Sequence, residues 1–226
     1  MAKIGLIGGT GREGRGLALR FALAGEQVII GSRSRERAES AARALAERNA
    51  GGVPILAGTN EEAARQADVA CISLPAAGMA ATLTELRASL RAKVVIEVVN
   101  PIARTADGFA ITPLEGAPSA AELAAMLLPD SDVVSAFKTI GARHLLDVPK
   151  PLLGDALICA DSPEAMRFAI DLAGRMPQLR AVDCGPLRNA RYVEATTALL
   201  LEINRIHAAT TSLRILDLKA GDPKVH

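Results

Sequence analysis

The chain has 226 residues, 26 of them Lys or Arg and 25 Asp or Glu, so its formal net charge is only +1. This balance provides no electrostatic basis for binding nucleic acid or an anionic membrane surface, and four Phe, one Tyr and no Trp argue against a surface that stacks bases or sugars. No apolar run approaches the roughly 20 residues that a membrane span needs. We therefore expect a soluble protein with one large domain, or one domain and a small satellite.

The first hundred residues alternate short apolar runs with helical patterns. We expect strands at 3–7, 27–30, 53–57, 69–74 and 93–98, and helices at 14–24, 34–49, 59–66 and 78–90. This β-α-β order is typical of parallel strands joined by right-handed crossovers. The predicted fold class is therefore α/β, beginning with a doubly wound parallel sheet of the Rossmann type.

The second half of the chain is less regular. Residues 102–118 are expected to form a loop, followed by a helix at 119–128 and a strand at 133–137. After an irregular stretch at 147–153 we expect a strand at 156–160, a helix at 163–175, a strand at 180–184 and a long last helix at 187–216. These elements predict a smaller C-terminal α/β domain, and we divide the chain into residues 1–141 and 142–226.

A glycine-rich loop follows the first strand. The segment Gly9-Thr10-Gly11-Arg12-Glu13-Gly14 matches G-x-G-x-x-G with a strand before it and a helix after it. In such a loop the first glycine permits a tight turn, the second lets a pyrophosphate approach the backbone, and the third lets the helix pack on the sheet. Backbone N–H groups at the start of the helix, including those of Arg12 and Glu13, would bind phosphate oxygens. The alternative is an ordinary glycine-rich turn.

The end of the second strand bears on which dinucleotide is bound. A site for NAD usually has an acidic residue there, but this chain has Ser32 and Arg33, then Arg37, and its first carboxylate is Glu36. Hydroxyl and guanidinium groups suit a 2′-phosphate, so we predict NADP(H). The alternative is a solvated run of charges, with Arg37 pointing into solvent.

Cysteines and histidines give no sign of a metal or disulfide site. Cys71, Cys159 and Cys184 each lie in an apolar run and form no Cys-x-x-Cys pair. The three histidines are His144, His207 and His226, and their spacing matches no metal motif. We expect no metal, buried thiols and a cytoplasmic location.

Several segments in order resemble one family, the NADPH-dependent reductases of the deazaflavin coenzyme F420, also called F420:NADP oxidoreductases. They include Gly8-Gly9-Thr10-Gly11 with Gly14-Arg15-Gly16-Leu17-Ala18, and Gly31-Ser32-Arg33. Further along they are Ser135-Ala136-Phe137-Lys138-Thr139-Ile140, Asp183-Cys184-Gly185-Pro186-Leu187 and Arg191-Tyr192-Val193-Glu194. The resemblance implies hydride transfer between NADP(H) and F420 or a similar deazaflavin, flavin or pterin-like ring, in a cleft between two domains. It also implies a homodimer with the last helix as a contact surface.

The resemblance also assigns roles by position. Thr10, Ser32 and Arg33 would hold the 2′-phosphate end, and Leu74-Pro75 with Asn100-Pro101 would line the nicotinamide side. Lys138, Thr139 and Ile140 would position the reacting rings, and Gly185, Pro186 and Leu187 would lie near the second ring.

This chain departs from the family pattern in the region assigned to the acceptor. Lys138 stands where the family usually has His, Gly141 where it has Pro, and Ala76 and Ala77 where it often has a bulky aromatic residue. These differences leave the identity of the hydride acceptor open. We expect Ala76, Lys138 and Gly141 to contact the acceptor. Lys138 would present its charge to an acidic substituent of the acceptor or, equally, reach solvent. Glu97 lies on an otherwise apolar strand, and if it is buried its carboxyl group needs a partner.

Two other functions remain open at this stage. One is an NADP-dependent dehydrogenase of a small imine or carbonyl, which would need Lys138 as a proton donor. The other is an NADPH-binding module without catalytic activity.

Overall fold

The computed structural model describes residues 1–218, and His226 lies outside the described residues. Eight strands form one sheet in the order β10-β9-β8-β5-β4-β1-β2-β3. Their bounds are β1 Lys3–Ile7, β2 Gln27–Ser32, β3 Ile55–Thr59, β4 Val69–Ile72, β5 Val94–Glu97, β8 Asp132–Ser135, β9 Gly154–Ala160 and β10 Leu179–Asp183. The mixed α/β architecture with a mostly parallel sheet confirms the predicted fold class.

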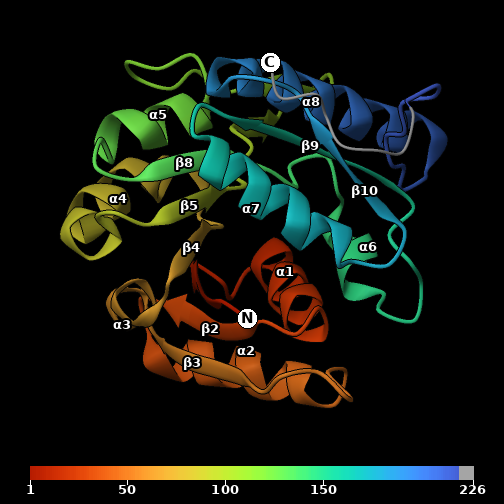
Figure 1. Ribbon diagram of the computed structural model, residues 1–226. Helices are drawn as coiled ribbons and strands as arrows, with labels where there is room; N and C mark the ends of the chain where they lie inside the picture. Colours follow the sequence, from red (N-terminus) through yellow and green to blue (C-terminus); the bar gives the residue numbers. More distant parts are fainter. Residues whose placement is uncertain (219–226) are drawn as a thin grey trace.

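Helices cover both faces of the sheet (Figure 1). One core lies beneath α1, α2, α6 and α7, and the other beneath α3, α4, α5 and α8. The helix bounds are α1 Arg12–Leu23, α2 Arg35–Ala46, α3 Asn60–Gln66, α4 Ala76–Leu90, α5 Ala120–Leu127, α6 Ala142–Leu146, α7 Pro163–Gly174 and α8 Ala190–His207. Because the strands are buried between two layers, they read as continuous apolar runs and not as alternating ones.

The sheet continues across the predicted division at residue 141. Strand β9 pairs antiparallel with β8, with Val134 opposite Ala160, and β10 then pairs parallel with β9. The C-terminal strands therefore run opposite to the first six, and their carboxyl ends point away from the edge at which β1, β4, β5 and β8 end. The division into 1–141 and 142–226 stays a prediction.

The predicted loop at 102–118 contains a small hairpin that no pattern in the sequence indicates. Strand β6 (Ile102–Arg104) pairs antiparallel with β7 (Phe109–Ile111). The turn between them is held by the Thr105 N–H on the Gly108 carbonyl at 2.8 Å, and Phe109 N–H donates to Glu202 on α8 at 2.5 Å. Strands of three residues are too short to give a periodic signal, and their stability depends on the contact with α8.

Helix α6 was also missed, and its stability comes from another helix. The side chain of Arg20, 4% exposed on α1, donates to the carbonyls of residues 144, 145, 147 and 150 at 2.9–3.0 Å. The carbonyls of residues 144 and 145 lie in the last turn of α6, where a short helix leaves them without partners of its own. A helix of five residues therefore forms because a distant guanidinium completes its hydrogen bonds.

The predicted helix at 187–216 is wrong in both length and start. A 3-10 turn, η1 (Leu187–Asn189), precedes α8, and the helix ends at His207, where the next residue, Ala208, has φ +47°. The Asn204 side chain accepts hydrogen bonds from the Thr211 N–H and hydroxyl at 2.7 and 2.8 Å. Two successive β-branched residues, Thr210 and Thr211, then favour an extended chain.

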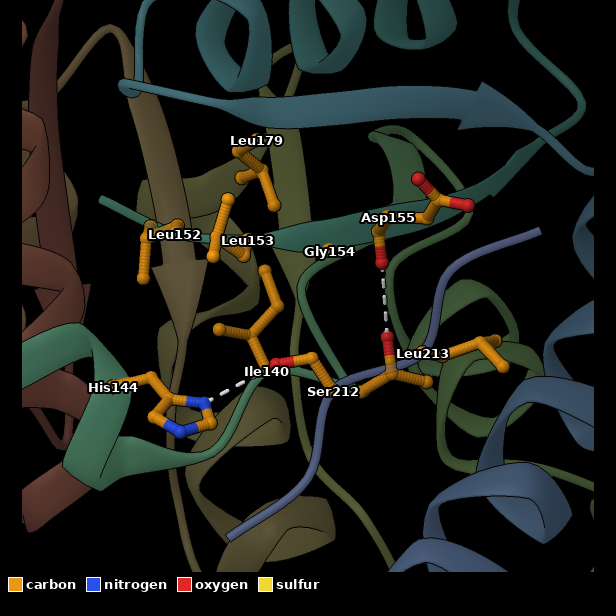
Figure 2. A pocket seen from close by; sticks show the side chains of 10 residues that line it. Ile140, His144, Leu152, Leu153, Gly154, Asp155, Leu179, Ser212 and Leu213 are labelled. Atoms are coloured by element: carbon orange, nitrogen blue, oxygen red, sulfur yellow. Dashed lines mark hydrogen bonds between the residues drawn. The ribbon is translucent and has the colours of Figure 1, made fainter. Parts of the chain in front are cut away.

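The tail after α8 lies along the first residues of β9. Asp155 N–H donates to the Leu213 carbonyl at 2.8 Å, and Ser212 Oγ lies 3.3 Å from His144 Nδ1 (Figure 2). The Asp155 carboxylate accepts from Arg180 at 2.7 and 2.9 Å and from Ile215 N–H at 2.7 Å. Burial alone would raise the pKa of Asp155, but these hydrogen bonds outweigh it and hold the pKa below its usual value. The tail is thus fixed by a buried carboxylate.

None of the helices within residues 1–218 is both long and apolar enough to cross a bilayer.

Candidate active site

The glycine loop joins β1 to α1 in the way that the sequence predicts, with one difference. The left-handed residue is Gly8, with φ +77°, and not Gly9. A Cβ on Gly14 would lie 2.6 Å from Gly9 Cα, so the third glycine allows close packing, whereas a Cβ on Gly11 would meet nothing within 4 Å. The chain is therefore tightly packed beneath the loop and open above Gly11.

The first turn of α1 is left available for an anion. No side chain caps α1, whereas α2, α3, α5 and α7 each begin at a Ser or Thr whose hydroxyl accepts a backbone N–H. Unpaired N–H groups and the helix dipole together favour a bound phosphate.

A first cavity of about 560 Å³ lies over this loop. It extends from the end of β2 to the start of α4, and its lining includes Thr10, Gly11, Ser32, Arg33, Arg37, Leu74 and Pro75. Seven of the residues predicted from the sequence are therefore brought together. Gly9 and Pro101 are buried, and Arg12 is exposed; none of these three is part of the lining of this cavity.

Positive charge dominates the end of the cavity near β2. Arg33 and Arg37 are exposed and both line the cavity. Glu36 is turned to the Ser34 hydroxyl, which donates to it at 2.6 Å, and Arg35 pairs with Glu62. This end therefore offers guanidinium groups, with the mostly buried Ser32 hydroxyl at the cavity wall. These groups suit a phosphate better than a ribose hydroxyl.

A second cavity of about 440 Å³ opens beside the end of β8. Lys138, Thr139, Ile140 and Gly141 line it, together with Asn100 and residues of α8 and the β6-β7 hairpin. A third, also of about 440 Å³, contains Leu74, Pro75 and Ala76 and shares Asn100 and Ile102 with the second. Because adjacent cavities share walls, they form one cleft along the carboxyl ends of the parallel strands, where ligands bind in open α/β sheets.

Lys138 has a different role from either one expected. Its side chain is fully buried, and Nζ lies 2.6 Å from Glu97 Oε2 and 2.9 Å from Glu194 Oε1 while also donating to the Val99 carbonyl. The ammonium is thus held by hydrogen bonds to the Val99 carbonyl and Glu194 and by an ion pair with Glu97. The expectations that Lys138 reaches solvent, or presents its charge to an acidic substituent, are wrong because these three acceptors hold the charge inside the protein.

The backbone of Lys138 still forms part of the cleft. Its carbonyl accepts from Asn100 Nδ2 at 3.0 Å and from Thr197 Oγ1 at 3.2 Å. The preceding residue, Phe137, has φ +59°, a strained conformation for a non-glycine residue. This backbone turn directs the Lys138 side chain inward and leaves Thr139 and Ile140 along the cleft wall.

Glu97 has the partner that its burial requires. Burial raises the pKa of Glu97 to about 7, and Lys138 opposes that rise. Glu194 also accepts from the Ala120 N–H at 3.0 Å. The cluster of Glu97, Lys138 and Glu194 therefore ties together the end of β5, the turn after β8, α8 and the start of α5.

Gly185, Pro186 and Leu187 do not join this cleft. Gly185 and Pro186 line a separate cavity of about 590 Å³ with Asp161 and Arg167, and Leu187 is 4% exposed in the core beneath α8. They follow β10, which runs opposite to β8, so their expected place near the second ring is not supported by the geometry. Their role here is to turn the chain from β10 into α8.

Other lining residues were not identified from the sequence. Asn60 Oδ1 accepts from Gly8 N–H at 3.0 Å and so fixes the loop turn, and Thr197 and Arg104 line the second cavity. Asn60 and Thr197 lie on helices whose patterns indicate only packing, and Arg104 lies in the hairpin that was missed. A small cavity near His144, of about 10 Å³, has room for a water molecule at most.

Comparisons with known proteins point to one family. Residues 3–101 match the family described as NADP oxidoreductase, coenzyme F420-dependent. The chain is 43% identical over 208 residues to the F420-dependent NADP reductase of Methanothermobacter marburgensis, covering 89% of this chain and 92% of the relative. It is 38% identical over 223 residues to the F420-dependent NADP reductase of Methanocaldococcus jannaschii, and this match covers 96% of this chain and 99% of the relative.

Among solved structures, a putative F420-dependent NADP reductase from Arthrobacter sp. superimposes with a TM-score of 0.77 at 21% identity. The match covers 95% of this chain and 99% of that one, and it bears on the fold alone.

Replacement of Lys138 tests the buried cluster. Lys138→Met should lower the free energy of unfolding by about 3–5 kcal/mol, because two buried carboxylates lose their cation. Without Lys138 the pKa of Glu97 rises further above its unfolded value, so the folded state binds more protons and stability falls as pH rises. Urea denaturation should therefore show a larger loss at pH 8 than at pH 5.

The matched control is Lys150→Met, because Lys150 is 78% exposed and pairs only with Asp147. We expect a change of at most about 0.5 kcal/mol there. Equal losses in the two variants would contradict a structural role for Lys138.

Proposed function

Since this chain belongs to the family of coenzyme F420-dependent NADP oxidoreductases, we infer that it catalyses hydride transfer between NADP(H) and F420. The observation that carries the inference is the identity of 38–43% with F420-dependent NADP reductases along nearly the whole chain. The cleft supports this inference. Arginine side chains suited to a phosphate, a glycine loop suited to a pyrophosphate and space for rings follow one another along it.

The residues of the first cavity fit NADP(H). Gly11 leaves room for the pyrophosphate against the open first turn of α1, and Ser32, Arg33 and Arg37 surround the place of the 2′-phosphate. Leu74 and Pro75 then direct the nicotinamide toward Asn100. We propose these residues as the NADP(H) contacts.

The second cavity is the proposed place where the two rings meet. The bound cofactors supply the hydride chemistry, and the protein holds the rings at the right distance and excludes water. Thr139, Ile140 and Gly141 form one wall, Asn100 another, and Thr197 with Asn204 on α8 a third. The lack of a side chain at Gly141 widens this space for the deazaflavin, and the small side chain of Ala76 widens the adjoining third cavity.

An imine or carbonyl dehydrogenase fits these residues less well. Such an enzyme would use Lys138 as its proton donor, but the Lys138 ammonium is fully buried and is held by Glu97, Glu194 and the Val99 carbonyl. The geometry therefore favours transfer between rings.

The direct test is an acceptor assay with the purified protein. With NADPH and F420 we expect the absorbances of the dihydronicotinamide and the oxidised deazaflavin to fall together, and much slower turnover with FMN, riboflavin or a pterin. Turnover with one of those rings and none with F420 would contradict the proposed acceptor.

Arg33 tests the dinucleotide end. Arg33→Ala should raise the KM for NADPH about tenfold to a hundredfold, because one charge-assisted contact is worth roughly 1.5–3 kcal/mol, and it should leave the KM for NADH nearly unchanged. Arg35→Ala is the matched control, since Arg35 is paired with Glu62 and does not line the cavity. Equal losses with NADPH and NADH would show that Arg33 does not contact the 2′-phosphate.

We also propose that the protein is a homodimer through α8, with residues 142–226 closing the cleft. Tyr192, Leu199 and Ile206 are 60–66% exposed and are spaced by seven residues, so they form one apolar stripe along the helix.

The free thiols of the chain favour a cytoplasmic location.

The stripe can be tested by one charged substitution. We expect light scattering to give the mass of two chains for the wild type and of one chain for Leu199→Asp. Leu56→Asp, at a 51% exposed position on β3, should stay dimeric. A dimeric Leu199→Asp would contradict an interface on α8.

A further inference from the structure

Among residues 1–218, Glu13 is the one carboxyl group that lines the second cavity. It lies on the first turn of α1, partly buried, and shares the cavity with Asn100, Thr139 and Ile140. Within residues 1–218 it has no ion pair and no hydrogen bond from a side chain or the backbone. A carboxyl group therefore stands unpartnered at the wall of the space proposed for the rings.

The ionisable groups on the surrounding elements do not stabilise a charge on Glu13. They are Arg12 and Arg15 on α1, Cys71 on β4, Glu97 on β5, Arg104 on β6, Lys138 after β8, and Arg143 and His144 on α6. Burial, with smaller contributions from the Glu13 and Glu97 carboxyls, raises the pKa of the Cys71 thiol, so this thiol is neutral. The Lys138 charge is held by Glu97 and Glu194.

Burial without a cation keeps the Glu13 carboxyl protonated. It raises the pKa of Glu13 to about 8, because removal from water disfavours the charged form. At neutral pH the side chain is therefore a neutral acid with a proton to donate into the cavity.

We propose that Glu13 is the proton donor that accompanies hydride transfer, giving its proton to the acceptor ring when F420 is reduced. This proposal rests on the proposed function, because it takes the second cavity as the meeting place of the two rings. It assigns to Glu13 a role beyond the backbone contact with phosphate expected from the glycine loop.

The reaction balances with one carboxyl proton. The C4–H bond of the dihydronicotinamide breaks, and its hydrogen leaves with both electrons to form a C–H bond on the acceptor ring. NADPH is oxidised and its ring gains a positive charge, while the acceptor is reduced and gains a negative one. The Glu13 O–H bond then breaks, its proton forms an N–H bond on the acceptor, and solvent returns a proton to the carboxylate.

The charges make the two transfers support each other. An opposite charge within about 4–6 Å lowers the pKa of a carboxyl by about 1–3. Oxidation of the nicotinamide therefore turns Glu13 from an acid that keeps its proton into one that releases it. In the reverse direction the carboxylate takes the proton from the reduced ring.

Proton release on binding tests the location of Glu13 without any turnover. At pH 8 we expect NADP+ binding to release about half a proton more per site than NADPH binding, because only NADP+ carries the ring charge and it lowers the Glu13 pKa. Calorimetry in buffers of different ionisation enthalpy measures this difference. It should disappear in Glu13→Gln and persist in Glu85→Gln, an exposed position on α4.

The pH dependence of kcat tests the chemical role. In the wild type, kcat for F420 reduction should fall above about pH 8 and kcat for the reverse reaction should rise over the same range. Glu13→Gln should lose both dependences and lower kcat about a hundredfold, within the usual contribution of general acid catalysis. A structural role alone would change neither pH profile.

The outcomes separate this proposal from the proposed function. If F420 is not turned over but the NADP+-specific proton release is present and depends on Glu13, the acceptor is wrong and Glu13 lies at the nicotinamide. If F420 is reduced normally by Glu13→Gln with the wild-type pH profile, or if the proton release is the same in that variant, Glu13 is not the proton donor.

Discussion

The ion cluster of Glu97, Lys138 and Glu194 determines where the cleft opens and what faces it. One buried ammonium joins the end of β5, the turn after β8 and helix α8, and Glu194 extends the connection to the first N–H of α5. Such a cluster is costly to bury, and its cost is offset only while the ammonium stays in contact with both carboxylates. It thereby fixes the orientation of the segment whose backbone forms the wall of the second cavity.

The two ends of the cleft are formed by different parts of the chain. The first βαβ unit supplies the loop, the open helix start and the guanidinium groups, all close together in sequence. The second cavity is assembled from segments far apart, including the turn after β8, the β6-β7 hairpin and α8. The reversal of β9 and β10, together with the tail fixed by Asp155, returns α8 to the edge where the first strands end.

This difference explains what could be predicted from the sequence. Gly11, Ser32 and Arg33 were identified because a nucleotide loop is a local pattern whose spacing has a direct geometric meaning. The direction of the Lys138 side chain could not be found in this way, because it depends on carboxylates 41 and 56 positions distant and on the left-handed backbone of Phe137. Leu187 was misplaced because nothing in its own segment reveals that β9 reverses, and α6 was missed because it depends on Arg20.

We propose that the dihydronicotinamide and the deazaflavin meet face to face in the second cavity and exchange a hydride directly. The measurement that tests it most directly follows deuterium from NADPH labelled at the reactive face of C4 into reduced F420, in ordinary water, by mass spectrometry and NMR. Direct transfer places the deuterium on carbon of the reduced deazaflavin, with the hydrogen on nitrogen coming from solvent. Reduced F420 that carries no deuterium, with the label lost to water, would contradict it.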